Sequence, residues 1–262
     1  MCTKAVILCF VFIVTSVLSE NSTIFSFVEH GATVEVNLIY TISGGIIPTL
    51  RRDDIANIQH VTTLKLIDND LVTIEPGAFH DLPKLKTLKI SRNDVEKIEA
   101  GIFNTLTNLT ELDLSENEIH TIATTAFHNM TSLNSLNLTN NKLTQLDLHW
   151  FDYTPSLQSL RICQNQLTEV PARAFTALKS KLDLSIFLED NYIEKIDKDA
   201  FQGLDKVTIL SLTDNLIACV DDEDFDKVFV ADVTEVAANS WKLECRTKIE
   251  AWAKGHNKTI KF

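Results

Sequence analysis

Asparagines recur along the chain at a constant spacing within a repeating pattern of hydrophobic positions. Successive members lie 24 residues apart, except for one step of 26: Asn69, Asn93, Asn117, Asn141, Asn165, Asn191 and Asn215. A phenylalanine follows ten residues after each asparagine: Phe79, Phe103, Phe127, Phe151, Phe175, Phe201 and Phe225. A constant period in this range predicts a solenoid, in which one unit repeats and buries its apolar face only against its neighbours.

The repeat unit can be followed around Asn117. The alternation Leu112, Asp113, Leu114 predicts a short strand with the leucines inward and the aspartate outward. The chain must turn after this strand, which buries backbone N–H and C=O groups. An asparagine side chain offers both a donor and an acceptor, so we expect Asn117 to be buried against those groups. The return half of each coil carries the phenylalanine, and the rings of successive coils are expected to stack.

The full pattern, LxxLxLxxNxLxxIxxxxFxxL, resembles the extracellular 24-residue type of leucine-rich repeat found in Toll-family ectodomains and small leucine-rich proteins. The resemblance covers roughly residues 37 to 239. It implies an α/β leucine-rich repeat solenoid, a curved horseshoe capped at both ends. A parallel β-sheet would line the concave face, and the convex side would be irregular or carry short helices. Ligands would bind on the concave face or on the lateral rims.

The first residues of the chain have the pattern of a secretory signal peptide, predicted for residues 1–19. Lys4 precedes the apolar run Ala5 to Leu18, which is too short to span a bilayer. Val17 and Ser19 suit the positions before a cleavage site. A retained membrane anchor is the alternative. The chain is therefore expected to be secreted, without a membrane span.

The remaining chain divides into three parts: an N-terminal cap strand (20–36), an array of about eight coils (37–229) and a C-terminal cap (230–262). Asn239 continues the asparagine series, and the residues after it resemble a cysteine-flanked C-terminal cap. In that cap Leu243 stands where the family has its first cysteine, so at most one bridge can form. Cys219 and Cys245 fall at similar phase in adjacent coils, which predicts a disulfide between them.

Removal of the signal peptide leaves three cysteines, and the third is Cys163. An odd count in a secreted protein indicates a free thiol or an intermolecular bond. Cys163 follows Ile162 and is expected to point outward near the concave rim, where it could link a disulfide-bonded dimer. A buried, inert thiol is the alternative.

Charge and sequons limit the possible partners. The formal net charge is −12, which opposes binding to nucleic acid or an anionic membrane and favours basic partners or solubility. Five N-x-S/T sequons predict a glycoprotein: Asn21, Asn108, Asn129, Asn137 and Asn257. No residue constellation predicts catalysis, a metal site or a cofactor.

The outward strand positions supply the candidate ligand-binding residues: Lys65, Lys89, Asp113, Arg161, Phe187 and Ile209. An exposed aromatic on such a face is a hot-spot candidate, and Phe187 is the one here. The 26-residue step lies just before Phe187, so an inward orientation in a distorted coil is its alternative. Asn137 occupies the outward middle position of the central strand.

The resemblance implies a non-enzymatic binding protein that recognises a protein or glycoconjugate ligand. Family analogy favours innate immune recognition, or modulation of a Toll-type receptor pathway as a decoy, including as a component of saliva or venom. A structural protein of the extracellular matrix or of adhesion is the alternative.

Overall fold

The computed structural model describes residues 38–55, 57–178, 183–204 and 206–262. The predicted signal peptide (1–19), the predicted N-terminal cap strand (20–36) and the sequon at Asn21 lie outside these residues.

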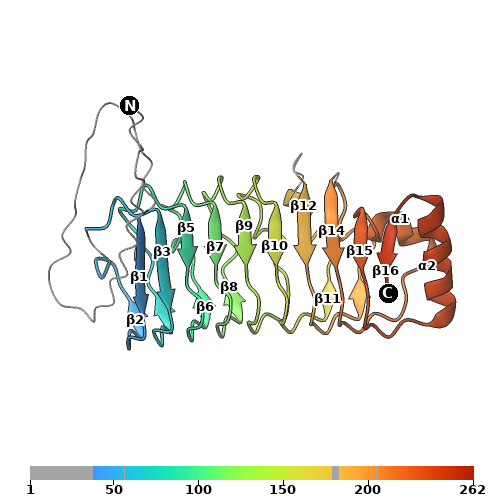
Figure 1. Cartoon of the computed structure of the whole chain (residues 1–262), viewed down its shortest axis with the longest axis horizontal. Helices are drawn as coiled ribbons and strands as arrows, with labels where there is room; N and C mark the ends of the chain where they lie inside the picture. The colour runs from blue at the N-terminus through green and yellow to red at the C-terminus, as the bar shows by residue number, and fades with distance from the viewer. Residues whose placement is uncertain (1–37, 56, 179–182, 205) are drawn as a thin grey trace, which may run out of the picture.

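A ten-stranded parallel sheet runs the length of the array and confirms the predicted solenoid (Figure 1). Each coil contributes one strand, paired in register with the strand of the next coil. In spatial order the strands are β1 (Ile39–Ser43), β3 (Thr63–Ile67), β5 (Thr87–Lys89), β7 (Glu111–Asp113), β9 (Ser135–Asn137), β10 (Ser159–Arg161), β12 (Leu184–Phe187), β14 (Val207–Ser211), β15 (Val233–Glu235) and β16 (Thr259–Lys261).

The return side of the coils carries short strand pairs and little helix. The pairs are β2 (Thr49–Leu50) with β4 (Thr73–Ile74), β6 (Lys97–Ile98) with β8 (Thr121–Ile122), and β11 (Glu169–Val170) with β13 (Lys195–Ile196). The helical segments are η1 (Thr176–Leu178), η2 (Asp222–Asp224), α1 (Phe225–Val228) and α2 (Leu243–Gly255).

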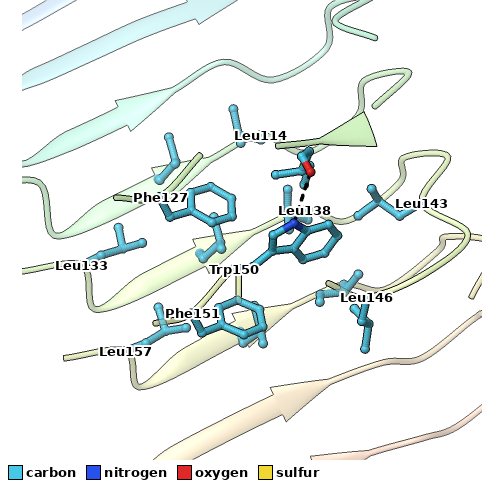
Figure 2. Close-up of a cluster of buried hydrophobic side chains, with 14 of the residues drawn as sticks. Leu114, Phe127, Leu133, Leu138, Leu143, Leu146, Trp150, Phe151 and Leu157 are labelled. Atoms are coloured by element: carbon cyan, nitrogen blue, oxygen red, sulfur yellow. Dashed lines mark hydrogen bonds between the residues drawn. The ribbon is translucent and has the colours of Figure 1, made fainter. Parts of the chain in front are cut away.

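The coil between β8 and β11 replaces its return strand with a buried tryptophan. Trp150 lies between Leu138, Leu143 and Leu146 (Figure 2). Its indole N–H donates to the carbonyl oxygen of Ile122 at 3.3 Å, which satisfies the one polar atom of this large side chain. The tryptophan therefore fills the coil and also binds the end of the preceding return strand.

Buried asparagines join each coil to the one before it. The Nδ2 atom of Asn117 donates to the carbonyl oxygen of Ile90 at 2.7 Å, and its Oδ1 accepts from the N–H of Val95 at 3.2 Å. Both bonds are made to the preceding coil. The same pair of contacts recurs along the array, from Asn93 to Asn239. We call these residues the ladder asparagines, and their predicted role is confirmed.

The phenylalanines on the return side are buried, and three pairs from successive coils stack as predicted: Phe79 with Phe103, Phe151 with Phe175, and Phe175 with Phe201. Ring centroids lie 5.9 Å apart for Phe79 and Phe103, and 5.5 Å apart for Phe175 and Phe201. Offset stacking of this kind adds to the gain from burying the rings. The rings and the inward leucines form one continuous core along the array.

A left-handed backbone turn precedes every ladder asparagine. The residue before it has a φ between 52° and 57° in each coil: Asp68, Arg92, Glu116, Asn140, Gln164, Asp190, Asp214 and Ala238. None of them is glycine, although this conformation is unfavourable for other residues. The turn brings the asparagine inward and leaves its neighbours exposed. We call the lateral surface formed by the residues just before and just after the ladder asparagines the ladder edge.

The C-terminal end is closed by a helix and a disulfide. Cys219 and Cys245 are bonded, with a Cα–Cα distance of 5.6 Å, as predicted. Helix α2 buries Ile249 and packs Trp252 against Phe229, with ring centroids 5.8 Å apart. The sheet itself continues into the region expected to be cap, because β15 and β16 both lie within residues 230–262.

We expect Asn117→Ala to lower the free energy of unfolding by roughly 2–4 kcal/mol, because buried backbone groups at Ile90 and Val95 lose their partners. Urea unfolding of the folded array measures this loss. Asn104→Ala, at an exposed position, is the control and should change stability by less than about 0.5 kcal/mol. Equal effects of the two substitutions would contradict the ladder role.

Removing the cap disulfide with Cys219→Ser should destabilise the protein by about 2–5 kcal/mol, since the bridge restrains the unfolded chain. Cys219 is the exposed member of the pair, so its replacement by serine buries no new hydroxyl. Thermal unfolding under oxidising and reducing conditions measures the effect. If reduction lowers the melting temperature of the wild-type protein and the variant alike, the bridge is not the cause.

Candidate ligand-binding face

The outward side chains of the ten-stranded sheet define the concave face. Cross-strand pairing places its middle row in a single line: Thr41, Lys65, Lys89, Asp113, Asn137, Arg161, Phe187, Ser211, Glu235 and Lys261. The sequence predicted this row as far as Ser211, but the Ser211 side chain is buried and does not reach the concave surface. The neighbouring strand positions on either side of this row point inward and are buried leucines or isoleucines in most coils. The core therefore holds the backbone of this face rigidly and does not restrict the identity of its side chains.

The N-terminal part of the concave face is basic. Lys89 Nζ lies 2.7 Å from Glu111 Oε1, across the pair of strands β5 and β7. Such a half-exposed ion pair contributes little stability, and it partly neutralises both groups. Lys65, one coil earlier, has no ion-pair partner within the described residues.

At the centre, side chains from successive strands are tied to one another. Asp113 accepts hydrogen bonds from Ser115 Oγ at 2.7 Å and from Asn137 Nδ2 at 3.0 Å. Asn137 Oδ1 in turn accepts from the N–H of Thr139 at 3.0 Å. The polar groups at the centre therefore already have partners, which lowers what they can gain from a ligand.

The C-terminal part of the face presents an aromatic–cation pair. The guanidinium carbon of Arg161 lies 4.0 Å from the ring centroid of Phe187. Phe187 is half-buried on the concave face in register with Arg161, so the alternative of an inward Phe187 is wrong. The irregularity expected near the long step instead falls between Leu184 and Ser185. Ile209, on the next strand, also faces outward.

Arg161 has no carboxylate partner within the described residues, and its side chain is exposed. A planar cation lying over an aromatic ring keeps its N–H groups free for a ligand carboxylate or carbonyl. Of the six candidate residues, the three at this end therefore combine exposed charge with apolar surface, whereas Asp113 is held by its neighbours.

Cys163 lies beside this pair, facing the concave side as predicted. Its thiol donates to Glu189 Oε2 at 2.7 Å. Burial, followed by the adjacent Glu189 carboxylate, raises the pKa of the thiol to about 12. Disulfide formation requires the thiolate, so this environment opposes the dimer expected through Cys163.

The sequons in the described residues occupy different surfaces. Asn108, Asn129 and Asn257 are exposed on loops, whereas Asn137 is half-buried on the concave face. Asn108 and Asn129 precede β7 and β9, on the side where the chain enters the sheet. Their modification remains a prediction.

Four overlapping segments match the family model described as leucine rich repeat, at residues 41–95, 83–143, 131–185 and 184–228. The chain belongs to the leucine-rich repeat family. No curated protein matches the sequence significantly. Within the described residues no helix is long and apolar enough to cross a membrane.

Solved structures of Toll-type receptors share the fold of this leucine-rich repeat protein. One is the TLR13–ssRNA13 complex, with a TM-score of 0.74 and 23% identity over 79% of this chain and 29% of that chain. Another is the Toll–Spatzle complex from Drosophila, with a TM-score of 0.60 and 20% identity over 77% of this chain and 35% of that one. The chain thus spans about a third of the length of these structures. Identities this low show the fold alone.

Two exposed apolar residues on the ladder edge were not anticipated from the sequence. Tyr192 is 56% exposed and Leu216 is 43% exposed, and each follows a ladder asparagine directly. Examining the position after each asparagine in the repeat would have revealed them, because most other coils carry a polar residue there.

We expect Cys163 to be alkylated by iodoacetamide at pH 8 roughly a thousand-fold more slowly than an ordinary thiol of pKa 9.0, because its raised pKa leaves little thiolate. Glu189→Gln removes the neighbouring carboxylate, lowers the thiol pKa and should accelerate the reaction. Asp190→Asn is the control and should leave the rate unchanged. Alkylation of the native protein as fast as of the unfolded chain would refute this account.

Proposed function

We propose that this protein is a secreted, non-enzymatic binding protein that recognises a protein or glycoconjugate ligand with the C-terminal part of its concave face. The observation that carries the proposal is the exposed Arg161 guanidinium lying 4.0 Å from the Phe187 ring centroid, on a rigid sheet. Arginine and aromatic residues are the side chains that most often dominate binding energy. Ile209 extends the same surface.

The biological setting we favour is innate immune recognition, or modulation of a Toll-type receptor pathway as a decoy. The likeness to the folds of Toll-type receptors supports this setting by analogy only. A decoy could act in the source's own extracellular fluid or in a secretion such as saliva or venom. The alternative function, a structural component of the matrix or of adhesion, would be favoured by recovery of the protein from matrix extracts.

Nucleic acid is a disfavoured ligand because the net charge is −12 and phosphate binding depends on clustered cations. The fold does not exclude it, since one structure with this fold is described as a complex with ssRNA. Gel mobility of a single-stranded RNA in low salt, with and without the protein, tests this part of the proposal. We expect no shift.

We expect the combined variant Arg161→Ala and Phe187→Ala to lose the ligand that the wild-type protein captures from its source's extracellular fluid, because both contributors to the exposed anchor are removed. The measurement is the amount of each captured component, identified by mass spectrometry. Lys65→Ala, at the same row position near the other end, is the matched control. Equal capture by both variants would place the binding surface elsewhere.

If the ligand contacts the C-terminal part of the face, a glycan at Asn137 should weaken binding only through its cross-strand partner Arg161, and should leave Phe187 and Ile209 open. Neighbouring strands are only about 4.8 Å apart, so a sugar at Asn137 would cover the outward residues at the centre. Glycopeptide mass spectrometry of natively secreted protein measures its occupancy, and Asn137→Gln tests the consequence. Full occupancy together with a ligand mapped across Asp113 and its neighbours would contradict the proposal.

A further inference from the structure

The ladder edge changes character in two adjacent coils. In the preceding coils the residue after the ladder asparagine is polar or charged: Asp70, Asp94, Glu118, Lys142 and Gln166. In the next two coils the same position holds Tyr192 and Leu216, and both are substantially exposed. The backbone N–H of Leu216 donates to the carbonyl oxygen of Ile193 at 2.9 Å, so the two side chains leave neighbouring coils at the same phase.

This apolar pair is bordered by carboxylates that make no ion pair with a basic side chain of the described residues. Asp190 and Asp214 occupy the left-handed positions two residues before Tyr192 and Leu216, and both are exposed. Glu194 follows two residues after Tyr192 and is also exposed. None of the three makes an ion pair within the described residues, although many other acids there do, such as Glu111 and Asp222.

The boundaries of this surface are set by the C-terminal cap and the concave face. Lys242 lies on the next coil, with its N–H bonded to the carbonyl oxygen of Ala218 at 3.0 Å, and Leu243 after it is 81% exposed. Phe187 lies five residues before Tyr192 in the same coil, so the concave face continues around the turn onto this edge. In Figure 1 the edge lies on the side toward which the arrowheads of β12 and β14 point.

We propose that the ladder edge around Tyr192 and Leu216, bordered by Asp190, Asp214 and Glu194, is a docking surface for a basic protein segment that carries apolar side chains. The inference deepens the proposed binding function and rests on it, by naming a second contact surface and the chemistry of the partner. Apolar anchors surrounded by charge are the usual anatomy of a specific protein interface. Fixed, unpaired carboxylates select a cationic partner and reject an acidic one.

A second copy of this chain does not fit the same surface. Two copies that met here would bring these carboxylates together, in molecules that each carry a net charge of −12. Like charges placed opposite one another oppose association. None of the sequons in the described residues falls on the edge, so predicted glycans leave the surface open.

A defined peptide probe tests the proposal without knowledge of the natural partner. The probe is a synthetic peptide of alternating arginine and leucine, titrated into the full-length secreted protein and followed by calorimetry. A peptide of alternating glutamate and leucine is the control for charge. We expect only the basic peptide to bind, and we expect its affinity to fall as salt is raised.

Two variants locate the site. Asp190→Asn with Asp214→Asn removes two charges and keeps residues that tolerate the left-handed conformation, and should weaken binding at least tenfold. Asp70→Asn with Asp94→Asn removes two unpaired charges from the same edge, five coils earlier, and should leave binding unchanged. Tyr192→Ser with Leu216→Ser should also weaken binding. Leu148→Ser with Tyr153→Ser removes a similarly exposed pair from the return side and should not.

Three results would overturn the proposal. The basic peptide does not bind, or it binds but none of the edge variants weakens its binding, or the acidic peptide binds equally well. Self-association of the wild-type protein that the edge variants abolish would also overturn it, in favour of a second copy. The concave-face proposal has a separate readout, because capture by the Arg161 and Phe187 variant does not depend on this peptide. The two proposals can therefore fail independently.

Discussion

The whole array depends on one side chain per coil that satisfies buried backbone groups of its neighbour. A solenoid turns sharply after every strand, and each turn leaves N–H and C=O groups away from water. The ladder asparagine supplies a donor and an acceptor at that point, as Asn117 does for Ile90 and Val95. The inward leucines and the phenylalanines of the core lie in the same coils as these turns, so the amides and the apolar residues stabilise one structure together.

This division of roles explains why the sheet can vary its surface freely. Inward positions and ladder positions are constrained in every coil, while the middle outward row carries lysine, aspartate, asparagine, arginine and phenylalanine in succession. A fold does not by itself select a ligand. Function in this chain therefore has to be sought in the few positions where outward residues lack internal partners, such as Arg161.

Much of the fold could be predicted from the sequence, because the constant repeat length determines which positions of each coil face inward and which face outward. The spacing of the asparagines placed Lys65, Asp113 and Phe187 in one outward row. The similar positions of Cys219 and Cys245 in adjacent coils predicted the disulfide between them. What the spacing could not supply were contacts between rows. The Cys163 thiol meets Glu189 across the irregular step, and the resulting environment changes its chemistry. Trp150 stands where most coils have an alanine before the phenylalanine, and its contact with Ile122 could not be predicted from the repeat pattern.

The direction of the asparagine bonds bears on how the chain is made. Each ladder asparagine binds backbone groups of the coil that precedes it in the sequence. When a coil leaves the ribosome, the backbone N–H and C=O groups of its turn therefore lack partners until the asparagine of the next coil has emerged. Folding of each coil thus has to wait for synthesis of one further repeat. The coil of Asn215 is closed in the same way, because Asn239 accepts from the N–H of Ile217 and donates to the carbonyl oxygen of Leu212.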